Sequence, residues 1–346
     1  MTYSRDTFLG LKEDLLEIFL RGVGSTCSDE NFNQMALRAF CLQCEANGPY
    51  GAFIKHRGLV PETVTHWGEI PHLPTRAFKT TDLFTGDGSR AEAVFRTSGT
   101  TRGGEERGRH LVRSLEIYRG SLLPSFQAHV LPEGDSMPVL ALLPDPADAP
   151  ESSLSFMIGA VKEGLCDGLG GYFATATGGV KWRELHITLR EAEARGEPVL
   201  LVGTAFAFVH WLEKAGEERW EVRLPPESRL METGGFKGRS RDLSREELYA
   251  RLERSFGIPS HRMVNEYGMT ELLSQFYEPV LRFSGAQGTG IEGRHHVGPP
   301  WVRTRVLDPL TLEPVPEGEL GILAHYDLAN LGSVSGILTE DLGRAV

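Results

Sequence analysis

Two short, uninterrupted apolar runs constrain the fold of this chain more than any other feature of its sequence. They occupy residues 138–143 and 199–202, and each ends in a loop that leads to a segment of helical character, of which 205–215 is the clearer. Strands buried on both faces of a parallel sheet are continuously apolar in this way, because helices cover both faces. Residues 229–231 and 263–264 are two further candidate strands. Alternating strands and helices predict an α/β layered architecture.

The segments on either side of this core have different patterns of apolar and polar residues. Residues 8–46 predict two helices, the first with an apolar stripe formed by Leu9, Leu11, Leu15, Ile18 and Phe19. After Gln287 the sequence changes to strands and turns, which predicts a small β-barrel-like subdomain with strands at 302–307 and 320–325. The expected organisation is an N-terminal helical segment (1–60), an α/β nucleotide-binding core (61–285) and a β-rich subdomain (286–346).

Composition excludes several classes of function. The formal net charge of −11 argues against a general nucleic-acid binder, because phosphate backbones require a basic surface. No run approaches the roughly 20 apolar residues that a membrane-spanning helix needs. The first residues carry no signal-peptide pattern, so we expect a cytoplasmic protein without a membrane span.

A glycine- and hydroxyl-rich loop follows the apolar residues 93–95. Residues 95–104 read Phe-Arg-Thr-Ser-Gly-Thr-Thr-Arg-Gly-Gly. Glycines let the backbone approach an anion closely, while hydroxyls and successive N–H groups supply donors for phosphate. The lysine that ends a P-loop is missing. Runs of this composition are also typical of plain turns, so the loop by itself leaves both interpretations open.

A second motif, Asn-Glu-Tyr-Gly-Met-Thr-Glu at 265–271, also follows a short apolar stretch. Tyr267 offers a ring to stack on a base, Thr270 a hydroxyl for a phosphate oxygen, and Glu271 a hard oxygen ligand for Mg²⁺. The alternative is a core tyrosine followed by a helix start, where the dipole favours Glu271. Both motifs fall at the carboxyl ends of predicted strands, where α/β sheets bind ligands.

Together the two motifs resemble the adenylate-forming (ANL) superfamily of acyl and aryl ligases. Residues 231–239, Met-Glu-Thr-Gly-Gly-Phe-Lys-Gly-Arg, and 271–277, Glu-Leu-Leu-Ser-Gln-Phe-Tyr, resemble its acyl-protein synthetase (LuxE-type) branch, which is related to phenylacetate–CoA ligases. Matching segments at 70–79, 152–157, 297–300 and 318–321 extend the resemblance over nearly the whole chain. It implies a layered α/β/α core with a small β-barrel-like subdomain. The sequence stops soon after Asp341, so the C-terminal lid of such ligases is expected to be absent or truncated.

The resemblance also implies a set of site residues for ATP and Mg²⁺. The β- and γ-phosphates fall to Thr97, Ser98, Gly99, Thr100 and Thr101, with Arg102 in place of the usual lysine and Arg107 or Arg109 as alternatives. Thr270 is expected to bind the α-phosphate and Glu271 to place the metal. The adenine is expected to be bordered by Gly234, Gly235, Phe236, Tyr267 and Gly268. Asp341, in Asp-Leu-Gly-Arg, is expected to accept hydrogen bonds from the ribose hydroxyls. Lys79 and Lys237 are treated first as surface charges and second as ligand contacts.

The implied reaction is ATP-dependent activation of a carboxylic acid, most simply a fatty acid, to an acyl-adenylate for transfer to a protein thiol. An acyl reductase is the expected partner, and the oligomeric state is left open. Alternatives are an acid–CoA ligase of the phenylacetate type and a non-catalytic nucleotide-binding subunit of a reductase complex. A fatty acid requires an apolar pocket, for which the candidates, each equally suited to a core, are Phe156, Met157, Phe173, Phe206 and Phe208.

The cysteines and histidines carry less information. Cys41 and Cys44 form a Cys-x-x-Cys pair within a predicted helix, without a second pair to complete a zinc site, so we interpret both as spectators. His295 and His296 lack a third ligand nearby and do not predict a metal site. LuxE-type proteins pass the acyl group to a cysteine of their own near the C-terminus, whereas no cysteine follows Cys166 in this sequence. We therefore expect no self-acylation at a dedicated cysteine.

Overall fold

The computed structural model describes residues 5–97, 107–134, 136–234, 243–283 and 290–346. The predicted residues Ser98, Gly99, Thr100, Thr101, Arg102, Gly235 and Phe236 lie outside these ranges. The helices are α1 (Arg5–Leu20), α2 (Asp29–Ala46), α3 (Gly48–His56), α4 (Ala77–Thr80), α5 (Leu115–Val130), α6 (Ser153–Leu165), α7 (Trp182–Arg195), α8 (Ala205–Glu218) and α9 (Arg245–Phe256). The strands are β1 (Leu73–Pro74), β2 (Ala93–Arg96), β3 (Arg109–Val112), β4 (Val139–Ala141), β5 (Gly170–Tyr172), β6 (Leu200–Thr204), β7 (Arg229–Thr233), β8 (Met263–Tyr267), β9 (Phe276–Tyr277), β10 (Val302–Leu307), β11 (Gly321–Asp327) and β12 (Gly336–Gly343).

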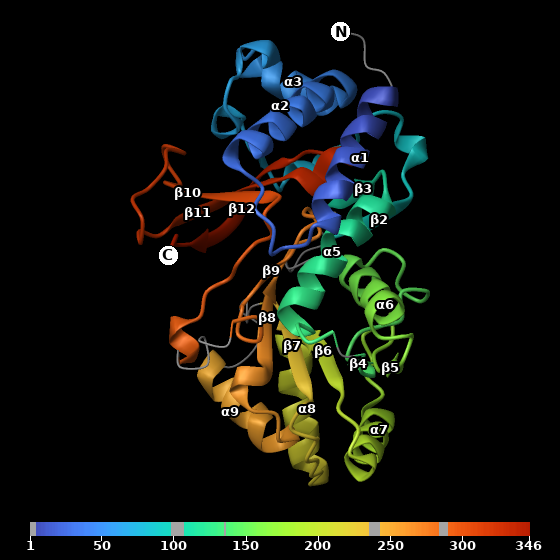
Figure 1. Ribbon diagram of the computed structural model, residues 1–346. Coiled ribbons are helices and arrows are strands. Elements are labelled where there is room, and N and C mark those ends of the chain that lie inside the picture. The colour runs from blue at the N-terminus through green and yellow to red at the C-terminus, as the bar shows by residue number, and fades with distance from the viewer. Residues whose placement is uncertain (1–4, 98–106, 135, 235–242, 284–289) are drawn as a thin grey trace.

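The centre of the molecule is a six-stranded sheet of order β5-β4-β6-β7-β8-β9 (Figure 1). Its first five strands are parallel, and β9 closes the edge antiparallel to β8. The four strands predicted from apolar runs are β4, β6, β7 and β8, neighbours in this sheet. The predicted helix at 205–215 is α8. The expected α/β class is confirmed.

Alternate residues of these strands point into two separate cores. Val139 and Ala141 pack with residues of α5 and α6, whereas Leu140 and Leu142 pack with residues of α7, α8 and α9. In β7, Met231 packs in the same core as Val139, whereas its neighbour Leu230 packs in the same core as Leu140. Because side chains alternate across a strand, this division produces the three layers of an α/β/α core.

The helical opening of the chain is confirmed, with a corrected apolar face. The buried residues of α1 are Phe8, Leu11, Leu15 and Phe19, while the predicted Leu9 is 40% exposed. Spacings of three and four residues place the observed set on one side of the helix. Ser28 caps α2 by accepting a hydrogen bond from Asn31 N at 3.2 Å. A third helix, α3, follows directly.

The β-rich region forms a four-stranded sheet of order β1-β12-β11-β10. Strands β10, β11 and β12 are antiparallel to one another, and β1 lies parallel to β12 at one edge. The sheet has an open strand order, with β1 and β10 at its two edges. Leu73 and Pro74, in the proline-punctuated connector, therefore belong to the same sheet as the last strand of the chain.

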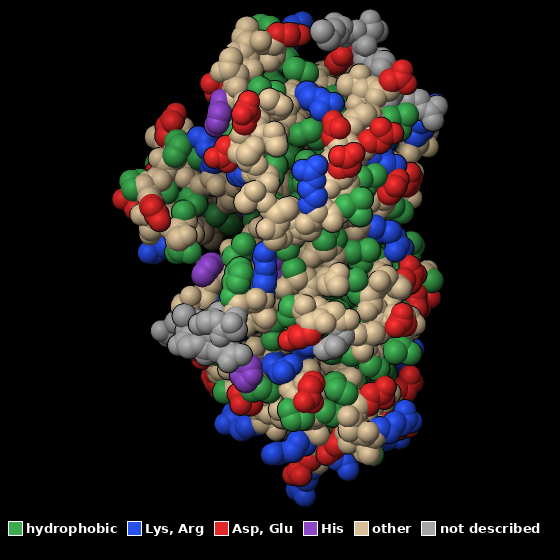
Figure 2. Space-filling model, viewed as in Figure 1, with side chains coloured by type: hydrophobic (Ala, Val, Ile, Leu, Met, Phe, Trp, Pro, Cys, Tyr) green, Lys and Arg blue, Asp and Glu red, His purple; other side chains and the backbone are tan. Residues whose placement is uncertain are grey.

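The two sheets meet at one side of the molecule. The β10–β12 sheet stands beyond the carboxyl ends of β7 and β8 (Figure 1). On the face shown in Figure 2, the surface is hollowed between this sheet and the lower part of the molecule. Within the described part of the chain, no helix combines the length and apolar character needed to cross a membrane.

Candidate active site

The predicted adenine-binding segments begin at Gly234 and Tyr267, at the carboxyl ends of β7 and β8, whereas the motif at 95–104 begins at the end of β2, outside this parallel sheet. Strands β7 and β8 are in register, with Thr233 opposite Glu266, so that Gly234 and Gly268 follow at neighbouring positions of the sheet edge. Gly234 has a φ of +82°, a left-handed conformation that favours glycine. The chain thus turns away from β7 where the predicted adenine-binding segment begins.

Tyr267 and Asp341 lie together although they come from different sheets. The Tyr267 hydroxyl donates a hydrogen bond to Asp341 Oδ2 at 3.1 Å. Burial above all, and then the charge of Asp341, raise the pKa of Tyr267, so the phenol stays protonated. The two residues expected to meet adenine and ribose are therefore neighbours. Stacking of the ring on a base stays a prediction.

His110 fixes the backbone of Thr270. Its Nδ1 lies 2.7 Å from the Thr270 carbonyl oxygen, and its Nε2 lies 2.8 Å from Ser333 Oγ. Because a carbonyl oxygen can only accept, Nδ1 carries the proton and Nε2 accepts from the serine hydroxyl. Burial lowers the pKa of His110 to about 4, which keeps this neutral tautomer. The Thr270 hydroxyl lies 3.4 Å from Ser153 Oγ, near the start of α6.

Asp327 and Asn330 hold the loop that follows Glu271. Asp327 accepts hydrogen bonds from the backbone N–H groups of Leu273 at 3.1 Å and Ser274 at 2.9 Å, and from the Ser274 hydroxyl at 2.8 Å. Asn330 accepts from Leu273 N at 3.0 Å and donates to the Glu271 carbonyl oxygen at 2.8 Å. The loop after the motif is thereby fixed to the end of β11.

Glu271 lies in an acidic and largely buried environment. Its pKa is raised to about 7, above all by burial and also by the charges of Asp341 and Glu340. Lys79 acts in the opposite direction. A carboxylate in such surroundings is stabilised by a cation placed beside it. The structure thus brings together Tyr267, Glu271 and Asp341, three of the predicted site residues.

Strands β2 and β3 form the hairpin from which the phosphate loop departs. Thr97 follows β2, and its N–H donates to the Gly108 carbonyl at 2.9 Å, while Gly108 N–H donates to Thr97 Oγ1 at 2.9 Å. Arg107 donates Nε–H to the Thr97 carbonyl at 2.6 Å. Arg109, another candidate for the missing lysine, forms a two-pronged ion pair with Asp82.

Glu266 is a buried carboxyl inside the second motif. It accepts a hydrogen bond from the Thr233 hydroxyl of the adjacent strand, and burial raises its pKa to about 7. A Cβ placed on Gly268 would collide with Glu266 Oε1. The glycine of Tyr-Gly-Met-Thr-Glu is therefore required by packing against this carboxyl.

We expect Gly268→Ala to destabilise the protein by about 1 to 3 kcal/mol, the range typical of overpacking. Gly216→Ala is the matched control, because nothing lies within 4 Å of a Cβ at this position of α8. The control should stabilise by about 0.5 to 1 kcal/mol, since alanine favours helices. Urea unfolding curves of the two variants measure both effects. Equal midpoints for the two variants would contradict the packing argument.

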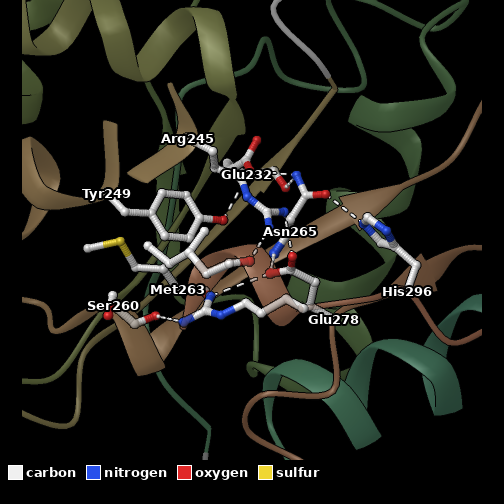
Figure 3. Close-up of polar contacts among 10 residues, drawn as sticks. Glu232, Arg245, Tyr249, Ser260, Met263, Asn265, Glu278 and His296 are labelled. Atoms are coloured by element: carbon white, nitrogen blue, oxygen red, sulfur yellow. Dashed lines mark hydrogen bonds and ion pairs between the residues drawn. The ribbon is translucent and has the colours of Figure 1, made fainter. Parts of the chain in front are cut away.

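A polar network ties β7, β8 and the chain after β9 together (Figure 3). Tyr249 donates its hydroxyl to Glu232 Oε1 at 3.1 Å, and Asn265 Nδ2 donates to the same oxygen. Glu278 is fully buried and pairs with Arg245 and with a second arginine, Arg294, at 3.4 Å. This network supports the strand ends from which the predicted adenine-binding residues project.

The acyl-pocket candidates separate into different environments. Met157, Phe173 and Phe208 are buried in the two cores. Phe156 is half-buried and stacks on Tyr118 with ring centroids 5.2 Å apart. Phe206, in the first turn after β6, is 45% exposed. Phe156 and Phe206 therefore keep accessible surface and remain the better candidates.

Burial dominates the environment of the four cysteines, although the charges of Arg303 and Arg21 lower the pKa of the Cys27 thiol. Burial above all raises the pKa of each thiol, to about 12 for Cys44. The charge of Asp167 raises the pKa of Cys166 further. Thiolate nucleophiles need the opposite effect. Burial therefore disfavours the thiolate form of all four cysteines, and the absence of an acyl carrier among them stays a prediction.

Sequence reasoning missed His110, Ser333, Asp327 and Asn330. Asp327 and Asn330 had a readable signal, because Asn330 interrupts the apolar residues 328–331 and Asp327 directly precedes them, and buried polar side chains need partners. His110 had none, since a histidine within a strand is unremarkable until its partners are seen.

Comparison with known proteins identifies the family. The model of the acyl-protein synthetase family LuxE matches residues 27–345. The chain belongs to the LuxE family. Two individual LuxE relatives share less than a third of the matched residues with this chain. A long-chain-fatty-acid–luciferin-component ligase from Vibrio harveyi is 24% identical over 304 residues, covering 86% of this chain and 74% of the relative. The corresponding ligase from Aliivibrio fischeri is 30% identical over 148 residues, covering 42% of this chain and 36% of the relative.

Solved structures confirm the fold of this LuxE-family chain. A 2-hydroxyisobutyryl-CoA ligase in the postadenylation state, in complex with 2-HIB-AMP, superposes with a TM-score of 0.62 at 15% identity. The match covers 91% of this chain and 63% of that ligase, so the chain spans less than two thirds of its length. The likeness shows that the two proteins share a fold over most of this chain.

Proposed function

We propose that this chain activates a fatty acid with ATP and delivers the acyl group to a thiol of a partner protein. The observation that carries the proposal is the convergence of Thr270, Glu271, Tyr267 and Asp341 at one sheet edge in a member of the LuxE family. The long-chain fatty acid as substrate rests on the names of the two relatives. An acyl reductase is the partner we infer.

The reaction has two steps. In the first, a carboxylate oxygen bonds to the α-phosphorus of ATP, and the bond from that phosphorus to the pyrophosphate oxygen breaks. In the second, a thiol sulfur bonds to the acyl carbon, AMP leaves with the electron pair of the broken C–O bond, and the thiol proton passes to solvent. Such displacements depend mainly on positioned donors and charges.

We assign roles to the described residues accordingly. Asp341, oriented by the Tyr267 hydroxyl, accepts from the ribose hydroxyls. Thr270, whose backbone His110 holds, donates its hydroxyl to the α-phosphate. Thr97 begins the loop that holds the terminal phosphates.

Magnesium fits the residues around Glu271. Protein sites for Mg²⁺ in nucleotide enzymes use one or two carboxylates and take further oxygens from phosphates and water. Glu271 supplies one carboxylate in an acidic setting, and no group of three His, Cys, Asp or Glu side chains forms a separate metal cage in the part of the chain that the structure describes. Bound Mg²⁺ would neutralise phosphate charge there.

The pH dependence of the adenylation rate should report Glu271. Its pKa is raised to about 7, and the ionised form is the one that acts, so kcat/KM for ATP should fall as pH drops through about 7. Glu266 is the control, because its pKa is also raised to about 7. Glu266→Gln should keep this acidic limb. If Glu266→Gln no longer showed the fall of kcat/KM at low pH, that fall would be assigned to Glu266 and not to Glu271.

Direct detection of products tests the whole proposal. The protein is incubated with MgATP and a series of straight-chain fatty acids, and acyl-adenylate and AMP are measured by mass spectrometry. We expect acyl-adenylate with long-chain acids and no acyl-CoA when free CoA is added. Formation of acyl-CoA would place the chain functionally among acid–CoA ligases. Tight ATP binding without any acyl-adenylate would indicate a non-catalytic nucleotide-binding subunit.

A further inference from the structure

We propose that Lys79 is a phosphate-binding residue of this site, with its ammonium group on the terminal phosphates of the nucleotide. The inference rests on the proposed function and names a cation for a loop whose sequence lacks the usual lysine. Three observations carry it: how α4 is anchored, which side chains Lys79 lies beside, and which charges surround it.

The short helix α4 is fixed between the two motifs. Thr75 N–H, just before α4, donates to the Leu338 carbonyl of β12 at 3.0 Å. Phe78 is buried and meets His110 edge-on, with ring centroids 5.4 Å apart. His110 is the residue that holds the Thr270 carbonyl. Lys79 thus directly follows Phe78, which contacts the histidine that binds the Thr270 carbonyl.

The side chain of Lys79 lies beside the start of the phosphate loop. A Cβ placed on Gly108 would lie 3.4 Å from Lys79 Cγ and 3.1 Å from Thr97 Cγ2. Lys79 and Thr97 therefore flank the same glycine. Gly108 is hydrogen-bonded to Thr97 in both directions, so this arrangement is part of the β2–β3 hairpin.

The charge of Lys79 reaches the carboxylate side of the site as well. Its positive charge lowers the pKa of Glu271, against the raising effects of burial and of two neighbouring acids. The stem of Lys79 passes beside Gly108, and an ammonium group on such a flexible stem can reach phosphates held at the start of this loop.

Comparing ATP with adenosine tests this role, because adenosine has no phosphate. Equilibrium binding is measured by calorimetry for the wild type, Lys79→Ala, Lys79→Arg and the control Lys55→Ala, which removes an exposed lysine of α3. Losing a charge-assisted phosphate contact should weaken ATP binding of Lys79→Ala about tenfold or more and leave adenosine binding unchanged. Lys79→Arg should recover most of the loss, and Lys55→Ala should match the wild type.

A second readout separates electrostatics from folding. Because salt screens a charge contact, raising the salt concentration should narrow the difference in ATP affinity between the wild type and Lys79→Ala and leave adenosine binding unchanged. Unchanged ATP affinity in Lys79→Ala, or equal losses for ATP and adenosine, would overturn the proposal. The binding contrast needs no turnover, so a wild type that binds ATP without adenylating any acid contradicts the proposed function and still leaves Lys79 testable.

Discussion

Replacing Glu271 by alanine should lower the adenylation rate about 100-fold or more, the scale of losing one preorganised electrostatic group. Glu271→Gln should be equally inactive, because the amide keeps the shape of the side chain and removes its charge. The backbone carbonyl of Glu271, which Asn330 binds, is present in both variants. The fold should therefore persist, and circular dichroism and the urea midpoint check this. The rate is measured as acyl-adenylate formed at saturating ATP and Mg²⁺.

Glu340→Ala is the matched control for this prediction. Glu340 is an exposed carboxylate whose charge reaches Glu271 and raises its pKa. Removing it should leave the rate near pH 8 almost unchanged and shift the acidic limb to lower pH. If Glu271→Ala kept activity within a few-fold of the wild type at saturating Mg²⁺, our placement of the metal would be wrong.

Asp327→Ala should have the largest effect on stability, about 3 kcal/mol or more. The carboxyl is fully buried, and its removal leaves the N–H groups of Ser274 and Ala329 without their acceptor, while Leu273 N–H keeps Asn330 as a second acceptor. The loop after Glu271 would lose its anchor, so activity should fall along with the free energy of unfolding. Urea unfolding and the adenylation rate are measured on the same preparation.

Asp308→Ala serves as the comparison. Asp308 also accepts two backbone N–H groups, from Leu310 at 2.9 Å and Thr311 at 2.8 Å, but at an exposed turn where water replaces the lost acceptor. Its unfolding midpoint and its activity should stay close to those of the wild type. Similar losses in the two variants would show that burial of Asp327 is not what makes it important.

The central sheet was predictable because several of its strands have a recognisable sequence pattern. Residues 138–143 and 199–202 are apolar without interruption, and only strands covered on both sides by helices need that pattern. The first helix was predicted with one error. Leu9 was placed on the buried face, whereas Phe8 occupies it, because both choices give helical spacing and only the partners of α1 distinguish them.

The β-rich region was harder to predict. Its edge strand β1 has two residues, Leu73 and Pro74, and is defined by pairing with Ile337 and Leu338 far along the chain. No local pattern encodes such a pairing, since two residues are too few to show the alternation of apolar and polar side chains that marks a strand. The long-range contact with β12 places β1 at one edge of this sheet.

In the site, too, local motifs were predictable from the sequence and long-range contacts were not. Tyr267, Thr270, Glu271 and Asp341 were predicted from short motifs, and the structure brings Tyr267 and Asp341 into hydrogen-bond contact. The residues that position them come from elsewhere in the chain, and their roles depend on which groups they meet. Burial also changes the chemistry of Glu271, whose pKa rises to about 7, and a sequence does not show burial of a carboxylate beside other acids.

Carboxylate-dependent exchange of labelled pyrophosphate into ATP tests the central claim most directly. The exchange requires that the acid, ATP and the residues around Glu271 form an acyl-adenylate reversibly, and it needs no knowledge of the thiol acceptor. The wild type should catalyse exchange with long-chain fatty acids, less with aryl acids and none without acid, and Glu271→Gln should abolish it. Absence of exchange with every acid of the panel, in protein shown to be folded, would contradict the account.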